Sequence, residues 1–125
     1  MSVVYDAGAL IAADRGDRKL WADHRTRLEL GVVPLTTAPV VAQVSRSPRQ
    51  AQLRRLLRGC QVAAFAPEQA YTVGALLNRA GTADVVDAHV VITAAPKAST
   101  VLTSDPSDLR QLSHQLSAPV PVRQV

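Results

Sequence analysis

The chain opens on a short apolar run that stops at a single acid. Residues 3–5 are typical of a buried strand, and Asp6 ends it just before an alanine-rich segment that predicts a helix through Leu10 and Ile11. Burying an unpaired carboxylate is costly, so such an acid normally has a partner or a cation. Asp6 is therefore the first candidate member of an acidic metal site.

Apolar runs and longer amphipathic segments alternate to the end of the chain. Pro34 falls inside the second apolar run, so we expect that strand to be interrupted or to lie at an edge of the sheet. Further strands are expected at residues 32–37, 61–65, 100–103 and 120–123, and further helices at about residues 18–30, 49–58, 67–81, 86–95 and 106–116, with another beginning near Pro39.

Helices of ten or more residues between strands indicate an α/β fold with a parallel sheet that is covered on both faces. At 125 residues we expect a single domain, residues 1–125, with one core. Ligand sites in such sheets lie beyond the carboxyl ends of the strands, where the strand order reverses. Asp6 and Asp105 each follow a predicted strand, so both are expected at this edge.

The composition favours a cytoplasmic protein with an anionic partner. Lys and Arg number 14 and Asp and Glu 10, and residues 46–58 hold five arginines and no acid. Nucleic acid is the obvious anionic partner, although a solvated helix face explains the arginines equally well. We expect no membrane helix and no signal peptide, because no apolar run is long enough and no basic region precedes the first one. The one cysteine, Cys60, is typical of a reducing compartment.

Two further pairs of acids have the spacing Asp-x-x-Asp at predicted helix starts. Asp84 and Asp87 form the first pair, and Asp105 and Asp108 form the second. An aspartate at a helix N-cap and an acid three residues later satisfy free backbone amides and the helix dipole. For either pair taken alone, capping is the simpler interpretation.

Taken together with Asp6, the two pairs favour a metal site. A parallel sheet would bring all three groups to one edge, where mutual repulsion would raise their pKa values unless a cation neutralised them. Oxygen ligands with no histidine or cysteine cluster suit Mg²⁺ or Mn²⁺ rather than zinc. The three histidines are dispersed along the sequence, and no serine nucleophile motif is present.

The chain resembles the PIN domains, specifically the VapC-type toxins of bacterial toxin–antitoxin pairs. The resemblance spans essentially the whole chain and rests on the order and spacing of residues 4–11, 38–44, 84–88 and 101–109. It implies a three-layer α/β/α sandwich with a central, mostly parallel sheet. It also implies that Asp6, Asp87 and Asp105 are the catalytic carboxylates that gather the metal, with Asp84 and Asp108 as further metal ligands.

The function implied by this resemblance is that of a Mg²⁺-dependent endoribonuclease, with Mn²⁺ as a second possible metal. The enzyme would hydrolyse RNA phosphodiesters with a metal-activated water, and a cognate antitoxin would inhibit it. A homodimer is expected on the same grounds. The apolar surface around Leu20, Trp21 and Leu28 is a candidate antitoxin groove, although ordinary core packing also explains each of these residues.

Two positions depart from the family pattern. Gln43 stands where a glutamate is usual, and Gly8 stands where a small hydroxyl residue is common. An amide oxygen can orient a metal-bound water but brings no charge and cannot act as a base. The alternative function is therefore a catalytically weakened PIN-like binding module. A receiver-type phosphoacceptor domain fits poorly, because the first strand ends on one acid rather than two and no lysine follows a late strand.

Overall fold

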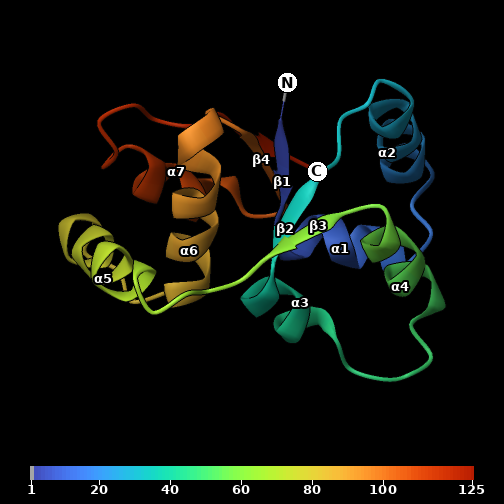
Figure 1. Cartoon of the computed structure of the whole chain (residues 1–125), viewed down its shortest axis with the longest axis horizontal. Helices are drawn as coiled ribbons and strands as arrows, with labels where there is room; N and C mark the ends of the chain where they lie inside the picture. Colours follow the sequence, from blue (N-terminus) through green and yellow to red (C-terminus); the bar gives the residue numbers. More distant parts are fainter. Residues whose placement is uncertain (1) are drawn as a thin grey trace.

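The structure is a computed structural model that describes residues 2–125. Short strands alternate with helices along the whole of this range (Figure 1). The strands are β1 (Val3–Tyr5), β2 (Leu35–Thr37), β3 (Gln61–Ala63), β4 (Thr100–Thr103) and β5 (Val122–Gln124). The helices are α1 (Ala7–Asp14), α2 (Arg18–Glu29), α3 (Ala38–Val44), α4 (Ala51–Arg58), α5 (Gln69–Ala80), α6 (Val85–Ala94) and α7 (Pro106–Ser113), with a 3₁₀ turn, η1 (Ala95–Lys97).

The five strands form one parallel sheet in the order β3-β2-β1-β4-β5. The first strand of the chain is therefore the central one, and Val4 pairs with Leu35 on one side and Val101 on the other. The chain runs outward through β2 and β3 and then returns to place β4 on the opposite side of β1. The strand order thus reverses between β1 and β4, where the rule for open parallel sheets locates ligand sites.

Helices cover both faces of this sheet (Figure 1). On one face α1 packs against β1 and β4 and contacts α2, α3 and α4. On the other face α6 packs against β1, β2 and β4, with α5 and α7 alongside it. This arrangement confirms the three-layer α/β/α sandwich expected from the sequence.

The core is built from the residues that the apolar pattern marks. Val4, Tyr5 and Leu10 at the start of the chain are fully buried, as are Val90 and Val91 in α6. Because β1 is buried between two neighbouring strands and two helix layers, every one of its side chains is apolar or aromatic up to Asp6. Within residues 2–125, none of the helices has the length and hydrophobicity needed to cross a membrane.

The position of the second strand in the sheet differs from the one expected from the sequence. Placing it at a sheet edge was wrong, because β2 lies between β1 and β3. Pro34 instead precedes the strand, so its missing amide costs the sheet nothing, and its carbonyl accepts a hydrogen bond of 2.9 Å from the Gln61 amide. Other element boundaries differ by a few residues; for example, α4 begins at Ala51 and α7 ends at Ser113.

Candidate metal centre at the switch point

Asp6 lies at the carboxyl end of the central strand, next to β4. Its amide donates a hydrogen bond of 2.9 Å to the Leu102 carbonyl, which extends the pairing of β1 with β4 by one residue. The Asp6 backbone also begins α1, but its carboxylate does not cap that helix. The side chain is therefore held at the point of strand-order reversal and remains available for another role.

The Asp6 carboxylate is buried and only half satisfied. Its exposed fraction is 6%; Oδ2 accepts a hydrogen bond of 2.8 Å from Thr103 Oγ1, whereas Oδ1 is buried without a hydrogen-bond partner in residues 2–125. Burial is the main reason that the pKa of Asp6 is raised; the nearby Ala7 amide and the Thr103 hydroxyl lower this pKa, and the charges of Asp84 and Asp105 raise it. A buried carboxylate oxygen without a donor is a place where a cation would be stabilised.

Thr103 connects Asp6 to the next acid along the sheet edge. Its hydroxyl donates to Asp6 and accepts a hydrogen bond of 3.0 Å from the Asp105 amide. The Asp105 carboxylate does not cap α7 but accepts a hydrogen bond of 3.2 Å from Ser107. Sequence reasoning missed Thr103, although its position at the end of a buried strand, two residues before an acid, is a usable signal.

Asp84 and Asp87 have different roles: Asp84 caps a helix, and Asp87 interacts with the other acids. Asp84 Oδ1 accepts a hydrogen bond of 3.0 Å from the Asp87 amide, so Asp84 is the N-cap of α6 and the capping interpretation holds for it. Asp87 lies one turn into the helix and is partly buried. Burial and the charges of Asp6, Asp84 and Asp108 raise the pKa of Asp87 to about 7.

The fifth acid, Asp108, is exposed in the first turn of α7. The charge of Asp105 is the main cause that raises the pKa of Asp108, and Asp84 adds a smaller repulsion. The charges of the two Asp-x-x-Asp pairs therefore interact with each other and with Asp6. The same coupling explains why the free cluster is a high-energy arrangement of like charges.

These five carboxylates have the chemistry that a hard divalent cation requires. Asp6 offers a buried oxygen with no other partner, and the donors are all oxygens at one edge of the sheet. In residues 2–125, no three His, Cys, Asp or Glu side chains are already arranged to hold a metal ion. Binding would therefore require the carboxylates to draw together, against the repulsion that a cation removes.

Gln43 takes no part in this electrostatic cluster. It is exposed in the last turn of α3 and carries no charge. Helix α3 begins at the carboxyl end of β2, where the Thr37 hydroxyl caps it. Gln43 is thus on an element that starts at the same edge of the sheet as Asp6.

The structure explains why position 8 is a glycine, which the sequence alone did not reveal. A Cβ atom on Gly8 would lie 2.5 Å from the backbone nitrogen, Cβ and Oγ of Ser104. No real side chain tolerates such a distance, so the turn between β4 and α7 packs directly on the first turn of α1. The hydroxyl group that the family pattern puts at position 8 has no room here, and the hydroxyl of Ser104 lies against that position instead.

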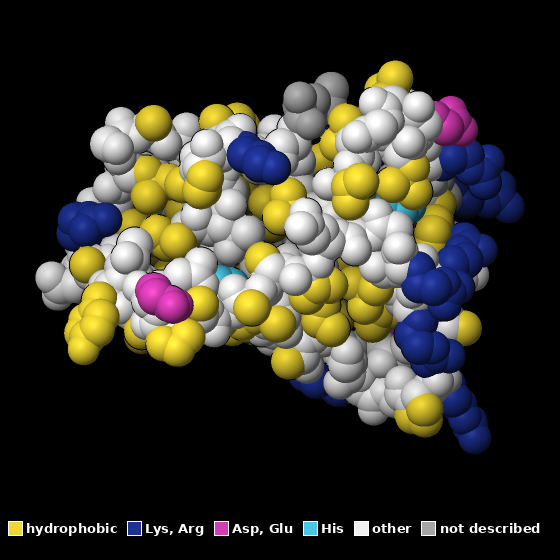
Figure 2. Space-filling view, viewed as in Figure 1, with side chains coloured by type: hydrophobic (Ala, Val, Ile, Leu, Met, Phe, Trp, Pro, Cys, Tyr) yellow, Lys and Arg dark blue, Asp and Glu magenta, His cyan; other side chains and the backbone are white. Residues whose placement is uncertain are grey.

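The surface proposed for a protein partner is partly core. Leu20 is buried at 4% exposure, whereas Leu28 is 40% exposed. Trp21 lies between them and is covered by the Arg55 guanidinium, 4.0 Å from the ring centroid. Figure 2 shows that Lys and Arg side chains gather on this side of the molecule, over α2 and α4.

Comparison with known proteins supports the fold. No family model and no curated protein matches the sequence. The structure is similar to VapBC2 from Rickettsia felis, crystallised with a DNA fragment from its promoter, with a TM-score of 0.72 and 13% identity over 100% of this chain and 99% of that one. It is also similar to PAE2754 from Pyrobaculum aerophilum, with a TM-score of 0.63 and 17% identity over 97% of this chain and 90% of that one.

Coverage of at least 90% of each chain at these TM-scores shows that the protein has the fold of a VapC-type PIN domain. The resemblance drawn from four short motifs is therefore confirmed at the level of the fold. An identity of 13% to 17% carries no information on activity, which has to be argued from the site itself.

Proposed function

We propose that this protein is a metal-dependent endoribonuclease, the toxin of a type II toxin–antitoxin pair. One observation carries the proposal: within residues 2–125, Asp6 has a buried oxygen without a hydrogen-bond partner at the switch point of a PIN-type sheet. The charges of Asp84 and Asp105 raise its pKa, and Asp87 and Asp108 belong to the same group of interacting charges. Mg²⁺ is the expected cofactor, and Mn²⁺ would serve as well. When bound, such an ion lowers the pKa of a water and neutralises charge on a phosphodiester.

The residues of the chain would divide the work between them. Asp6, Asp87 and Asp105 are proposed as the catalytic carboxylates that hold the cation, with Asp84 and Asp108 as assisting ligands. Thr103 would keep Asp6 in orientation through its hydroxyl, because it donates to Oδ2 and leaves Oδ1 free. Asp87 has a pKa near neutrality, so it would lose a proton when the cation binds.

A cleavage assay tests this function directly. Wild-type protein should cleave single-stranded RNA with Mg²⁺ or Mn²⁺ and lose that cleavage in EDTA. Asp6→Asn and Asp87→Asn keep the shape of the side chain but remove a charged ligand, so each should abolish most cleavage while the protein remains folded. Equal cleavage by the wild type and both variants would refute the site assignment.

A catalytically weakened binding module is the second candidate function, and Gln43 is the observation that favours it. The residue is exposed and uncharged on a helix that starts at the site edge, so it adds no negative charge for the cation. Under this alternative, the wild type binds Mg²⁺ weakly and does not cleave RNA, whereas Gln43→Glu restores both properties. Failure of Gln43→Glu to change either property would count against it.

The partners follow from the same proposal. An RNA substrate, a cognate antitoxin, a homodimer and a cytoplasmic location are all proposed on the strength of the VapC-type fold. The exposed face of α2 with Leu28 and the Arg55–Trp21 contact is the proposed antitoxin surface. Co-expression with the protein encoded beside it, followed by purification of the complex, tests the antitoxin partner.

A further inference from the structure

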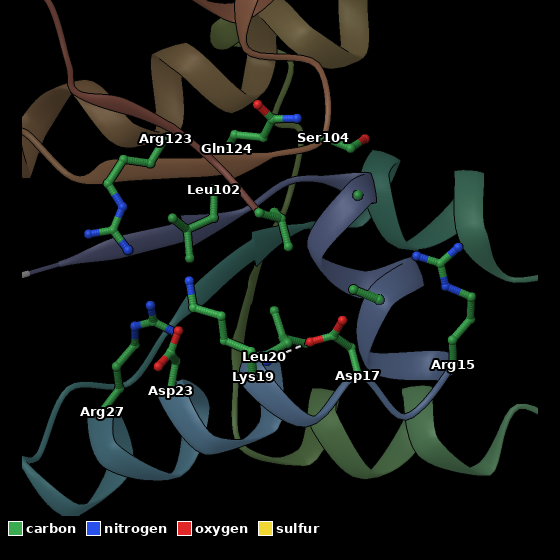
Figure 3. Close-up of a pocket in the computed structure, with 13 residues that line it drawn as sticks. Arg15, Asp17, Lys19, Leu20, Asp23, Arg27, Leu102, Ser104, Arg123 and Gln124 are labelled. Atoms are coloured by element: carbon green, nitrogen blue, oxygen red, sulfur yellow. Dashed lines mark hydrogen bonds between the residues drawn. The ribbon is translucent and has the colours of Figure 1, made fainter.

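A cavity lies beside the Gly8–Ser104 contact. It has a volume of about 330 Å³ and opens between α1, α2 and the strands β4 and β5 (Figure 3). Gly8 and Ser104, which line it, lie two residues after Asp6 and one residue before Asp105, and Leu102 contributes an apolar wall. A volume in this range is typical of sites that accept a small molecule or one unit of a polymer.

The charge of this cavity is opposite to that of the acidic edge. Four cationic side chains line it against two carboxylates: Arg15, Lys19, Arg27 and Arg123 against Asp17 and Asp23. Lys19 rises from α2 and Arg123 descends from β5 into the space between these elements (Figure 3). The net balance of the lining is positive, which favours an anionic ligand.

One of the two carboxylates caps a helix, and the other lies among the cations of α2. Asp17 is the N-cap of α2 and accepts a hydrogen bond of 2.9 Å from the Leu20 amide. Asp23 lies four residues from both Lys19 and Arg27, on one face of α2. Arg27 in turn donates a hydrogen bond of 3.1 Å to the Tyr5 hydroxyl, so its position is fixed by the core.

Lys19 and Arg123 point into the same space (Figure 3), so one ligand can engage both. Both are exposed, and they come from different elements on opposite sides of the cavity. The carboxyl-rich edge repels an anionic polymer, and a cationic site directly beyond Ser104 offsets this repulsion for the next unit of the chain. A polymer with one negative charge per unit, as in the phosphate backbone of RNA, matches this alternation.

We propose that the cavity between α2 and β5 is a subsite for a backbone phosphate of the RNA strand, next to the phosphate that is cleaved, with Lys19 and Arg123 as its ligands. This inference rests on the proposed ribonuclease function. Phosphate contacts of this kind position a strand without reading its sequence. The subsite would set which bond of the strand faces Asp6 rather than which base precedes it.

Binding without cleavage tests the subsite independently of the enzyme activity. The affinity for a fluorescently labelled single-stranded oligoribonucleotide is measured in EDTA by anisotropy, over a series of salt concentrations. The plot of log K against log salt has a negative slope, and each lost phosphate contact should make it shallower by about 0.7 for a single strand. Lys19→Gln and Arg123→Gln should each show this decrease, and the double variant should show about twice that.

Matched controls separate this effect from a general loss of positive charge. Lys97 lies at the opposite edge of the sheet, because it precedes the start of β4. Lys97→Gln should leave the salt dependence unchanged, and Lys19→Arg should retain the wild-type salt dependence. Equal salt dependence in the subsite variants and the control would overturn the proposal. A second probe is polyglutamate, an anionic polymer without phosphate: if the subsite variants lose affinity for polyglutamate and keep their affinity for RNA, the proposal is also overturned.

The proposal and the enzyme activity fail in different ways. Absence of divalent-dependent cleavage by the wild type would refute the ribonuclease function, whereas the slopes measured in EDTA would still decide the subsite. With an active enzyme, Lys19→Gln and Arg123→Gln should raise KM for RNA and leave kcat nearly unchanged, because neither residue contacts the reacting phosphate. A decrease in kcat at constant KM would overturn the role of these residues.

Discussion

Thr103 donates a hydrogen bond of 2.8 Å to Asp6 across the central pair of strands, although the two residues are 97 positions apart in the sequence. The same hydroxyl accepts the amide of Asp105. One threonine therefore holds the first acid of the cluster and fixes the turn that carries Asp105. Its contribution can be measured through both the stability and the pKa of the site.

Thr103→Val should destabilise the metal-free protein at neutral pH. The change keeps the shape of the side chain but leaves Asp6 Oδ2 buried without a donor, which costs about 1–3 kcal/mol. The loss should shrink at low pH, where Asp6 is protonated and the charge is gone. Urea unfolding at neutral and acidic pH measures both effects, and Thr103→Ser, which keeps the hydroxyl, is the control. Identical behaviour of the valine and serine variants would show that the hydrogen bond is unimportant.

Asp87 should make the metal-free protein less stable as the pH rises from about 4 to about 7. Its pKa is raised from 3.8 to about 7, so the folded state binds more protons than the unfolded state over this interval. The free energy of unfolding therefore falls as the pH increases through the interval and is not affected further by this group above it. Below the ordinary pKa both states are protonated and the penalty is absent.

The measurement is urea unfolding in EDTA across this pH range, for the wild type and Asp87→Asn. The asparagine resembles the protonated acid, so the variant should gain stability relative to the wild type as the pH rises. A difference between the two proteins that stays constant with pH would contradict the raised pKa.

Gly8→Ala should destabilise the fold, because its Cβ would lie 2.5 Å from the Ser104 backbone nitrogen. Overpacking of this kind costs about 1–3 kcal/mol. Gly8→Ser, which restores the hydroxyl residue of the family pattern, should destabilise for the same reason. Gly74→Ala in the middle of α5 is the control: nothing lies within 4 Å of its Cβ, so the helix should gain about 0.5–1 kcal/mol. Thermal unfolding of the three variants gives the result, and a stable Gly8→Ser protein would contradict the close contact.

Local patterns were sufficient to predict most of this fold. The apolar runs and the helices between them identify a parallel sheet, and Asp6 and Asp105 each follow a strand, so their common edge could be expected. The spacing of Asp84 and Asp87 also indicates a cap at the start of α6, for which Asp84 and Thr82 were both candidates. These features depend on neighbouring residues, which a single sequence displays.

The features that sequence reasoning missed depend on contacts between distant segments. The position of β2 inside the sheet depends on β3 pairing with its far side, which nothing near Pro34 reveals. The Thr103–Asp6 hydrogen bond and the Gly8–Ser104 contact likewise join the two ends of the chain. The basic cavity is formed by α2 and β5, about a hundred residues apart, so the pairing of Lys19 with Arg123 is visible only in the folded protein.

Divalent metal binding tests the central claim most directly, since it requires neither an RNA target nor a fast enzyme. Mn²⁺ titration, followed by electron paramagnetic resonance or calorimetry, should show binding by the wild type at about pH 7.5 that weakens as the pH falls and the carboxylates protonate. Asp6→Asn and Asp87→Asn should each lose most of this affinity, whereas a matched change in an acid outside the cluster, Asp17→Asn, should not. Mn²⁺ affinity that is the same in all four proteins would contradict a metal centre at Asp6.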